Sequence, residues 1–154
     1  MSRALILACG NTLRGDDGVG LYVANSLADE LRDPEITIQC DHQWTPELAE
    51  PISEAELVIF VDASASLPPG EIACQPLQPA PNPPAQFTHQ TSPSALLSLA
   101  AELYGHIPAR SYLLTVGGKS FDLLEELSEP VRQAVPAVLQ RIRELLSRPQ
   151  RPES

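Results

Sequence analysis

Residues 4–20, ALILACGNTLRGDDGVG, constrain the fold more than any other stretch of this 154-residue sequence. A short apolar run from Ala4 to Cys9 is followed by a loop punctuated by glycines, and a helical pattern begins near Asp16. A strand, a tight turn and a helix start in this order are typical of open α/β folds, which build sites at the carboxyl edge of a parallel sheet. We therefore expect an α/β fold with a site at the end of its first strand.

The loop carries adjacent carboxylates, Asp16 and Asp17. Nucleotide-binding loops instead offer bare backbone N–H groups, often with a lysine, to a phosphate. The glycine spacing is not GxGxxG, and the sequence has no Walker lysine, no HExxH pair and no GxSxG motif. Two adjacent acids repel a phosphate and attract a cation, so the loop favours a cation site over a nucleotide site.

Strand-like and helix-like segments alternate along the rest of the chain. The run from Leu57 to Asp62 is apolar over its first five residues, which is typical of a central parallel strand covered on both faces. Further strands are expected over 35–40, 71–77 and 111–116, and helices over 17–31, 45–52, 94–104 and 129–148, with Thr45 and Ser92 as N-caps. This order predicts a single-domain three-layer α/β/α sandwich over residues 1–148, with a mostly parallel twisted sheet of about five strands. A polar tail follows over 149–154.

The formal charge of −10 and the pI near 4.6 argue against nucleic acid or an anionic membrane as a partner. No apolar stretch approaches the roughly 20 residues of a membrane span. Arg3 is followed by only six apolar residues before Gly10, so we expect no signal peptide and a cytoplasmic protein. Three widely spaced cysteines, Cys9, Cys40 and Cys74, lie in apolar runs without a CxxC pair, which predicts buried reduced thiols.

The candidate site residues come from three separate segments. Asp17 follows the first strand and Asp62 ends the central one, so their loops are expected to face one another across a crevice. His89 follows a proline-rich stretch and can enter the same crevice. Two carboxylates and one imidazole suit a borderline divalent metal with positions open for an external ligand. Structural roles are open alternatives: a helix cap for Asp16 or Asp17, an Asx turn for Asp62, and a surface position for His89.

Other polar residues compete for this role. His42 and Asp41 follow the second strand and could reach the same edge, whereas His106 lies beyond a helix and is expected at the opposite edge of the sheet.

The motif GNTLRGDDGVG resembles the GNxLxxD(D/E)GxG signature of the hydrogenase maturation endopeptidases. The resemblance continues through VIFVDAS, FTHQTSP and LLTVGGKSFDLLEELS, and so covers nearly the whole chain. It implies a twisted sheet sandwiched by helices, with residues 1–148 forming one hydrogenase maturation protease domain. It also implies an aspartyl-type endopeptidase that removes a C-terminal extension from the large-subunit precursor of a [NiFe] hydrogenase after nickel insertion.

The resemblance also assigns roles to residues. The second acid of the signature falls on Asp17, the central-strand aspartate on Asp62 and the later histidine on His89, and these three would contact nickel carried by the substrate. Asp17 and Asp62 are then the catalytic candidates that orient the water. Asp16 is expected to shape the loop or cap the helix. The segment DHQWTPEL, residues 41–48, departs from the glycine-rich turn of some members and leaves the roles of Asp41 and His42 open.

Two other functions are compatible with the same residues. A non-catalytic, metal-binding maturation chaperone could dock on the precursor through the same crevice. A nucleotide-binding enzyme is the more distant alternative, because Asp16 and Asp17 occupy the place of a phosphate.

Overall fold

The apolar run predicted to be a central strand forms β3 (Leu57–Ser64), in the middle of a five-stranded sheet. The strands of the computed structural model, which describes residues 3–11, 15–80, 91–121 and 126–147, are ordered β2-β1-β3-β5-β4. The others are β1 (Ala4–Cys9), β2 (Ile36–Asp41), β4 (Ile72–Pro76) and β5 (Arg110–Gly117). All neighbours pair in parallel except β4, which runs antiparallel to β5 at one edge.

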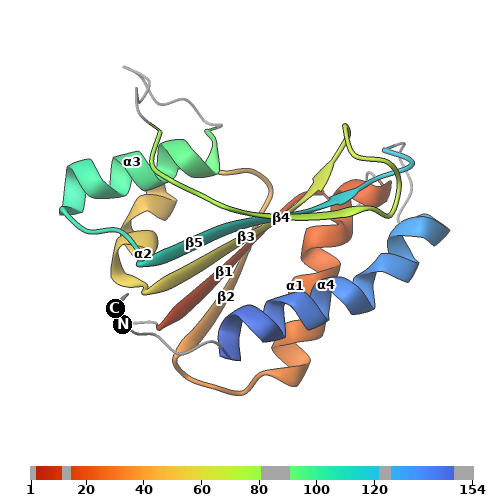
Figure 1. The fold of residues 1–154 in the computed structure, drawn as a ribbon, viewed down its shortest axis with the longest axis horizontal. Coiled ribbons are helices and arrows are strands. Elements are labelled where there is room, and N and C mark those ends of the chain that lie inside the picture. Colours follow the sequence, from red (N-terminus) through yellow and green to blue (C-terminus); the bar gives the residue numbers. More distant parts are fainter. Residues whose placement is uncertain (1–2, 12–14, 81–90, 122–125, 148–154) are drawn as a thin grey trace.

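Helices cover both faces of the sheet (Figure 1). Helices α1 (Val19–Glu30) and α4 (Glu129–Ser147) lie on one face, and α2 (Ala49–Glu54) and α3 (Pro93–Tyr104) lie on the other. Alternate strand residues feed the two cores, so that Ile6 packs on the α1–α4 side and Leu7 on the α2–α3 side. The predicted three-layer α/β/α sandwich with its mostly parallel sheet is confirmed.

Local capping chemistry agrees with the sequence at one helix and differs at another. Ser92 caps α3, since its hydroxyl accepts the Ala95 N–H at 3.1 Å. Thr45 makes no side-chain cap bond. The reason is a 3-10 turn, η2 (Pro46–Leu48), in which the Leu48 N–H donates to the Thr45 backbone carbonyl instead.

Some expectations fall on parts of the chain that the structure does not describe. The tail expected over 149–154 lies outside the described residues. None of the described helices is long and apolar enough to cross a membrane. The domain bounds and the cytoplasmic location stay predictions.

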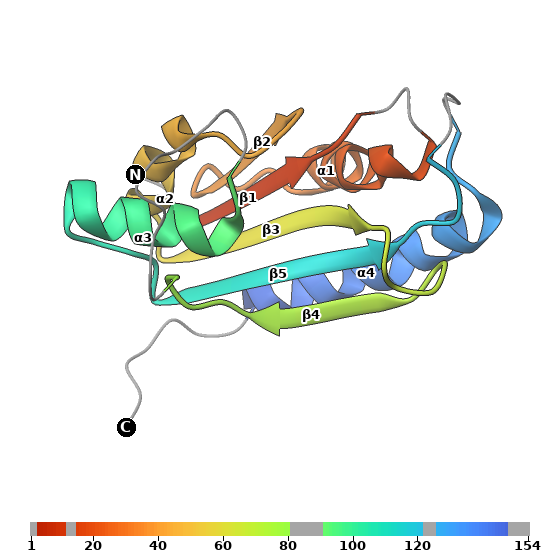
Figure 2. The same ribbon diagram turned by 90° about the horizontal axis from the view of Figure 1, so that it is seen from above.

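Two glycines bring the first loop close to the sheet. Gly10, directly after β1, has φ +148°, and a Cβ atom there would overlap the backbone carbonyl of Asp17. Gly20 lies in the first turn of α1, where a Cβ atom would be 2.9 Å from the carbonyl oxygens of Cys9 and Val61. Helix α1 therefore begins directly against the end of β1 and the second half of β3, and Figure 2 shows the carboxyl ends of both strands on the same side of the molecule.

Replacing Gly20 by alanine is expected to lower the free energy of unfolding by about 1–3 kcal/mol, because the new methyl group must push α1 away from the backbones of β1 and β3. Urea unfolding of Gly20→Ala tests this. Gly105→Ala is the comparison at a position with φ +71° and open space around its Cβ, where the cost comes from the backbone alone. An unchanged stability of Gly20→Ala would contradict the close approach.

Candidate functional site

Asp16 is a buried structural anchor in the 3-10 turn η1 (Gly15–Gly18), with no solvent exposure. Its carboxylate accepts the backbone N–H groups of Lys119, Ser120 and Ser128 at 2.7, 3.0 and 2.6 Å, and the Ser128 hydroxyl at 2.7 Å. Its own N–H donates to the Ser120 carbonyl at 2.8 Å. Asp16 thus ties the first loop to the segment between β5 and α4. It shapes the loop and does not cap α1, whose N-cap is Gly18.

These hydrogen bonds decide the charge of Asp16. Burial by itself raises the pKa of the carboxyl, but the donors from Ser128, Ser120 and Lys119 outweigh burial and lower the pKa below its ordinary value. Asp16 is therefore ionised in the folded protein with its oxygens fully engaged. Its donors come from the distant segment between β5 and α4, whereas the carboxylate of Asp17, the second acid of the loop, accepts the Asn11 N–H from the same loop.

Asp17 is half-buried and stands at the end of β1. Its carboxylate accepts the Asn11 N–H at 2.9 Å, and its backbone is folded against Gly10. The side chain lies close enough to Asp62 for its charge to raise the pKa of that residue. The structure therefore brings together two of the three predicted site residues.

Asp62 lies within β3, which continues to Ser64, so the strand runs two residues further than expected and Asp62 does not sit in a turn after it. Its carboxylate accepts the Ala63 N–H at 2.8 Å. The pKa of Asp62 is raised to about 6, chiefly by burial; the Ala63 N–H lowers it, and the charge of Asp17 raises it further. A carboxyl with this pKa exchanges a proton near neutral pH, which is what general acid–base chemistry requires.

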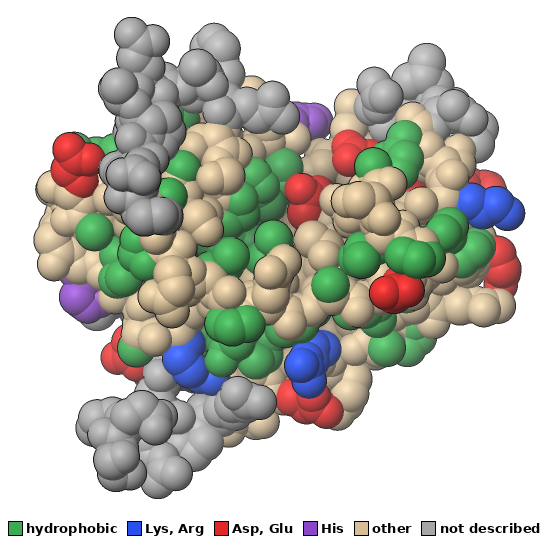
Figure 3. All heavy atoms as spheres, turned by 45° about the horizontal axis from the view of Figure 1, so that its top comes forward, with side chains coloured by type: hydrophobic (Ala, Val, Ile, Leu, Met, Phe, Trp, Pro, Cys, Tyr) green, Lys and Arg blue, Asp and Glu red, His purple; other side chains and the backbone are tan. Residues whose placement is uncertain are grey.

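Cys9 and Asp41 complete the carboxyl edge of the sheet. Cys9 is the partner of Asp41 in the parallel register of β1 and β2. Burial is the largest cause that raises the pKa of the Cys9 thiol, and together with the charges of Asp62, Asp17 and Asp41 it brings the pKa to about 12. The thiol is therefore protonated, and three carboxylates from three segments surround the end of β1. Figure 3 shows acidic side chains near the middle of one face, beside hydrophobic ones.

A small pocket of about 110 Å³ adjoins this edge and is lined by Leu21, Cys40, Asp41 and His42. Sequence reasoning left Asp41 and His42 open. The register of neighbouring parallel strands would have identified Asp41, because it pairs with the last residue of β1.

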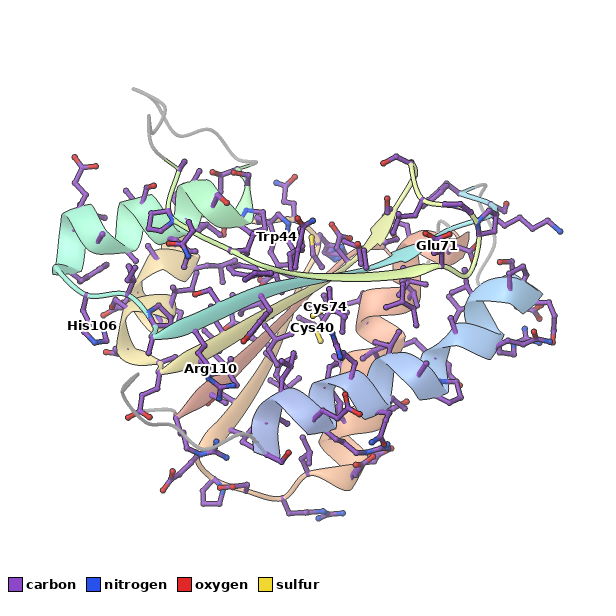
Figure 4. All side chains as sticks on the ribbon, in the orientation of Figure 1. Cys40, Trp44, Glu71, Cys74, His106 and Arg110 are labelled. Atoms are coloured by element: carbon purple, nitrogen blue, oxygen red, sulfur yellow. The ribbon has the colours of Figure 1, made fainter. Side chains whose placement is uncertain are left out.

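The histidines are distributed as follows. His106 lies at the opposite edge, as predicted, where its Nδ1 hydrogen-bonds the Ser53 carbonyl (Figure 4). His89 lies outside the described residues, so its predicted meeting with Asp17 and Asp62 stays a prediction. Within the described part of the chain, no group of three or more His, Cys, Asp or Glu is arranged to hold a metal ion.

The prediction of three buried thiols is correct only for Cys9. All three cysteines are free, but Cys40 is exposed and Cys74 is half-buried. Both lie on the outermost strands, β2 and β4, where one side of the strand faces away from the sheet. Cys40 and Cys74 are close in the projection of Figure 4, but Figure 2 places their strands at opposite edges.

The fold closely matches solved structures of hydrogenase maturation proteases. The hydrogenase maturating endopeptidase HybD from E. coli has a TM-score of 0.75 and 24% identity, covering 94% of this chain and 91% of that one. The [NiFe] hydrogenase maturation protease HycI from Thermococcus kodakarensis KOD1 has a TM-score of 0.73 and 26% identity, with 96% and 94% covered. HybD from Thermococcus kodakarensis has a TM-score of 0.71 and 26% identity, with 93% and 98% covered.

No protein-family model matches the sequence, and no curated protein matches it either. The structural matches nevertheless confirm the resemblance that the sequence motifs indicate, over nearly the whole chain.

Asp16→Asn is expected to lower the free energy of unfolding by about 2–4 kcal/mol at pH 7, because an amide nitrogen would face buried N–H donors. Ser128→Ala removes only the hydroxyl donor and should cost about 1 kcal/mol. Since the pKa of Asp16 is lowered by folding, its contribution is present above the ordinary pKa of 3.8 and is lost as pH falls. Urea unfolding from pH 7 to pH 3 should show the difference between wild type and Asp16→Asn shrinking; a constant difference would contradict this account.

Asp62→Asn is expected to stabilise the protein above pH 6. Folding moves the pKa of Asp62 from 3.8 to about 6 and so favours the protonated form. The free energy of unfolding of the wild type therefore falls as pH rises between these values, a cost that asparagine does not have. The variant should gain about 1–3 kcal/mol at pH 7.5 and much less at pH 4. Equal stability of the two proteins at pH 7.5 would show that the carboxylate is not destabilising.

Proposed function

Because the chain is a peptidase with the fold and motifs of the hydrogenase maturation endopeptidases, we propose that it processes the large-subunit precursor of a [NiFe] hydrogenase. The reaction is the removal of a C-terminal extension after nickel has been inserted. The observation that carries this proposal is the pairing of Asp17 with Asp62 at the carboxyl edge of β1 and β3. The strands that follow β1 in the chain, β2 and β3, lie on opposite sides of it, which makes the gap between β1 and β3 a topological switch point. Open α/β sheets place their ligands at such points.

The two carboxylates have different surroundings, which suits different roles. Asp17 accepts the Asn11 N–H and is positioned by the anchor at Asp16 next to it. Asp62 lies within β3, where burial is the main cause that raises its pKa to about 6. An ionised Asp62 near neutral pH accepts a proton from the attacking water and returns it to the leaving amine, as a general acid–base group does.

Nickel enters this proposal as part of the substrate. Two carboxylates, with His89 as the third ligand, form an incomplete set for a borderline divalent metal. The precursor supplies the remaining ligands, so that only nickel-loaded precursor is held in place for cleavage. A surplus of negative charge at the end of β1 favours an approaching cation and fits this role.

We expect Asp17→Asn, Asp62→Asn and His89→Ala each to reduce cleavage at least about a hundredfold, because each removes a nickel-contacting or proton-accepting group. The measurement is the mass of a hydrogenase large subunit co-expressed with each variant, with and without nickel. Wild type should shorten the large subunit only when nickel is supplied.

Two matched controls lie away from the site. Asp29→Asn changes an exposed carboxylate on α1. His106→Ala changes a histidine beside the amino ends of the strands, away from the candidate site, so both variants should retain cleavage. Undiminished cleavage of metal-free precursor would contradict recognition through nickel. Precursor binding with no change of mass in nickel-replete cells would favour the non-catalytic chaperone.

A further inference from the structure

The outer side of β2 has no strand partner in the described part of the chain, since β2 is the last strand on its side of the sheet (Figure 2). The Asp41 carbonyl accepts the Gly10 N–H and the Glu35 carbonyl accepts the Ala4 N–H. Odd-numbered residues of β2 therefore pair with β1, and the backbone groups of Ile38 and Cys40 point away from the sheet. Together these two residues present two N–H and two carbonyl groups along one line.

The opposite edge strand is protected from such pairing. In β4, bonds between Gly117 and Glu71 and between Leu77 and Ser111 turn the odd-numbered residues toward β5. Pro76 then occupies an outward position, where it has no N–H to offer. Edge strands are commonly protected by proline or charge, because an open edge invites pairing with another chain. The outward segment Ile36–Cys40 of β2 contains neither a proline nor a charged residue.

The open edge leads into the candidate site. The last residue of β2, Asp41, is paired with Cys9 and contributes to the field around the end of β1. The pocket lined by Leu21, Cys40, Asp41 and His42 is at the same end of the strand. At the other end, Asp33 and Glu35 both pair with Arg3, at 3.7 and 3.6 Å, and Arg32 directly precedes Asp33. The edge is thus bordered by more negative than positive charge, which suits a neutral or basic polypeptide.

We infer that the outer side of β2 is the docking edge for an extended segment of the polypeptide substrate, which pairs with Ile38 and Cys40 as a sixth strand. This inference rests on the proposed function and names how that substrate is held. In strand addition of this kind, the main-chain hydrogen bonds supply the affinity. The direction of β2 then sets the direction in which the docked segment leaves the sheet. The segment continues past Asp41 toward the carboxylates of Asp17 and Asp62.

Strand spacing sets the distance between docking and chemistry. A segment docked outside β2 lies three strand spacings from β3, because β2 and β1 stand between them. This distance is roughly 14 Å. An extended chain covers about 3.3 Å per residue, so about four residues connect the docked segment to the peptide bond held beside Asp62. A substrate peptide that ends within about four residues of the cleaved bond cannot reach β2 and so loses the affinity that docking supplies.

The first test removes one outward N–H. Cys40→Pro deletes the donor at a position where the ladder with β1 is unaffected. We expect KM for the nickel-loaded precursor to rise about tenfold relative to Cys40→Ala, which reports the loss of the thiol alone, with kcat changed less than about twofold. Cys74→Pro is the matched control, since it makes the same change at an outward position of β4 and should leave KM unchanged.

The second test needs no variant. Amide hydrogen exchange of the wild-type protein with a peptide of the precursor spanning the cleavage site should show slowed exchange at Ile38 and Cys40, with no change over β4. An unchanged exchange at both residues, or equal KM for Cys40→Pro and Cys40→Ala, would overturn the docking edge while cleavage by wild type keeps the proposed function. A wild type that cleaves no precursor would instead refute the proposed function. Sedimentation showing that Cys40→Pro turns a wild-type dimer into a monomer would overturn the inference in favour of pairing between two copies of the chain.

Discussion

The carboxylate of Asp16 is the contact on which the site depends. It is fully buried and is met by three backbone N–H groups and one hydroxyl, all from the segment that joins β5 to α4. A buried charge is tolerated only when it is hydrogen-bonded in this way. The anchor fixes the loop after β1, and the adjacent Asp17 is thereby directed to the end of the sheet. One acid of the pair holds the loop so that the other is free to act.

The acidic groups at the carboxyl edge of the sheet are arranged in an electrostatically unfavourable way. Burial and the charge of Asp17 raise the pKa of Asp62, and the charges of Asp62, Asp17 and Asp41 raise the pKa of Cys9 in addition to burial. Such groups are costly to the fold and are typical of sites where charge is used. The packing of β1 and β3 beneath them offsets that cost, since residues 4–8 and 57–61 have no or almost no solvent exposure. The same arrangement that weakens the folded state concentrates negative charge at the end of β1.

Patterns in the sequence predicted the layers, the parallel strands and the nearness of Asp17 to Asp62, because strand ends in a parallel sheet share one edge. They did not reveal the partners of Asp16, since its donors are backbone groups more than a hundred residues away, and a backbone N–H carries no signature in the sequence. The exposure of Cys40 was missed for a related reason. Whether a strand lies at an edge is a property of strand order, and apolar content alone does not report it.

The sequence distance spanned by the Asp16 anchor has a consequence for biosynthesis. Ser128 is 112 residues from Asp16, so both loops must be present before the anchor forms. A growing chain on the ribosome that has completed β1, β2 and β3 still lacks the donors that hold the acidic loop. Contacts of such long range form late in folding. The acidic loop that carries Asp17 is therefore held in place only when nearly the whole chain has emerged, and shorter chains lack this arrangement.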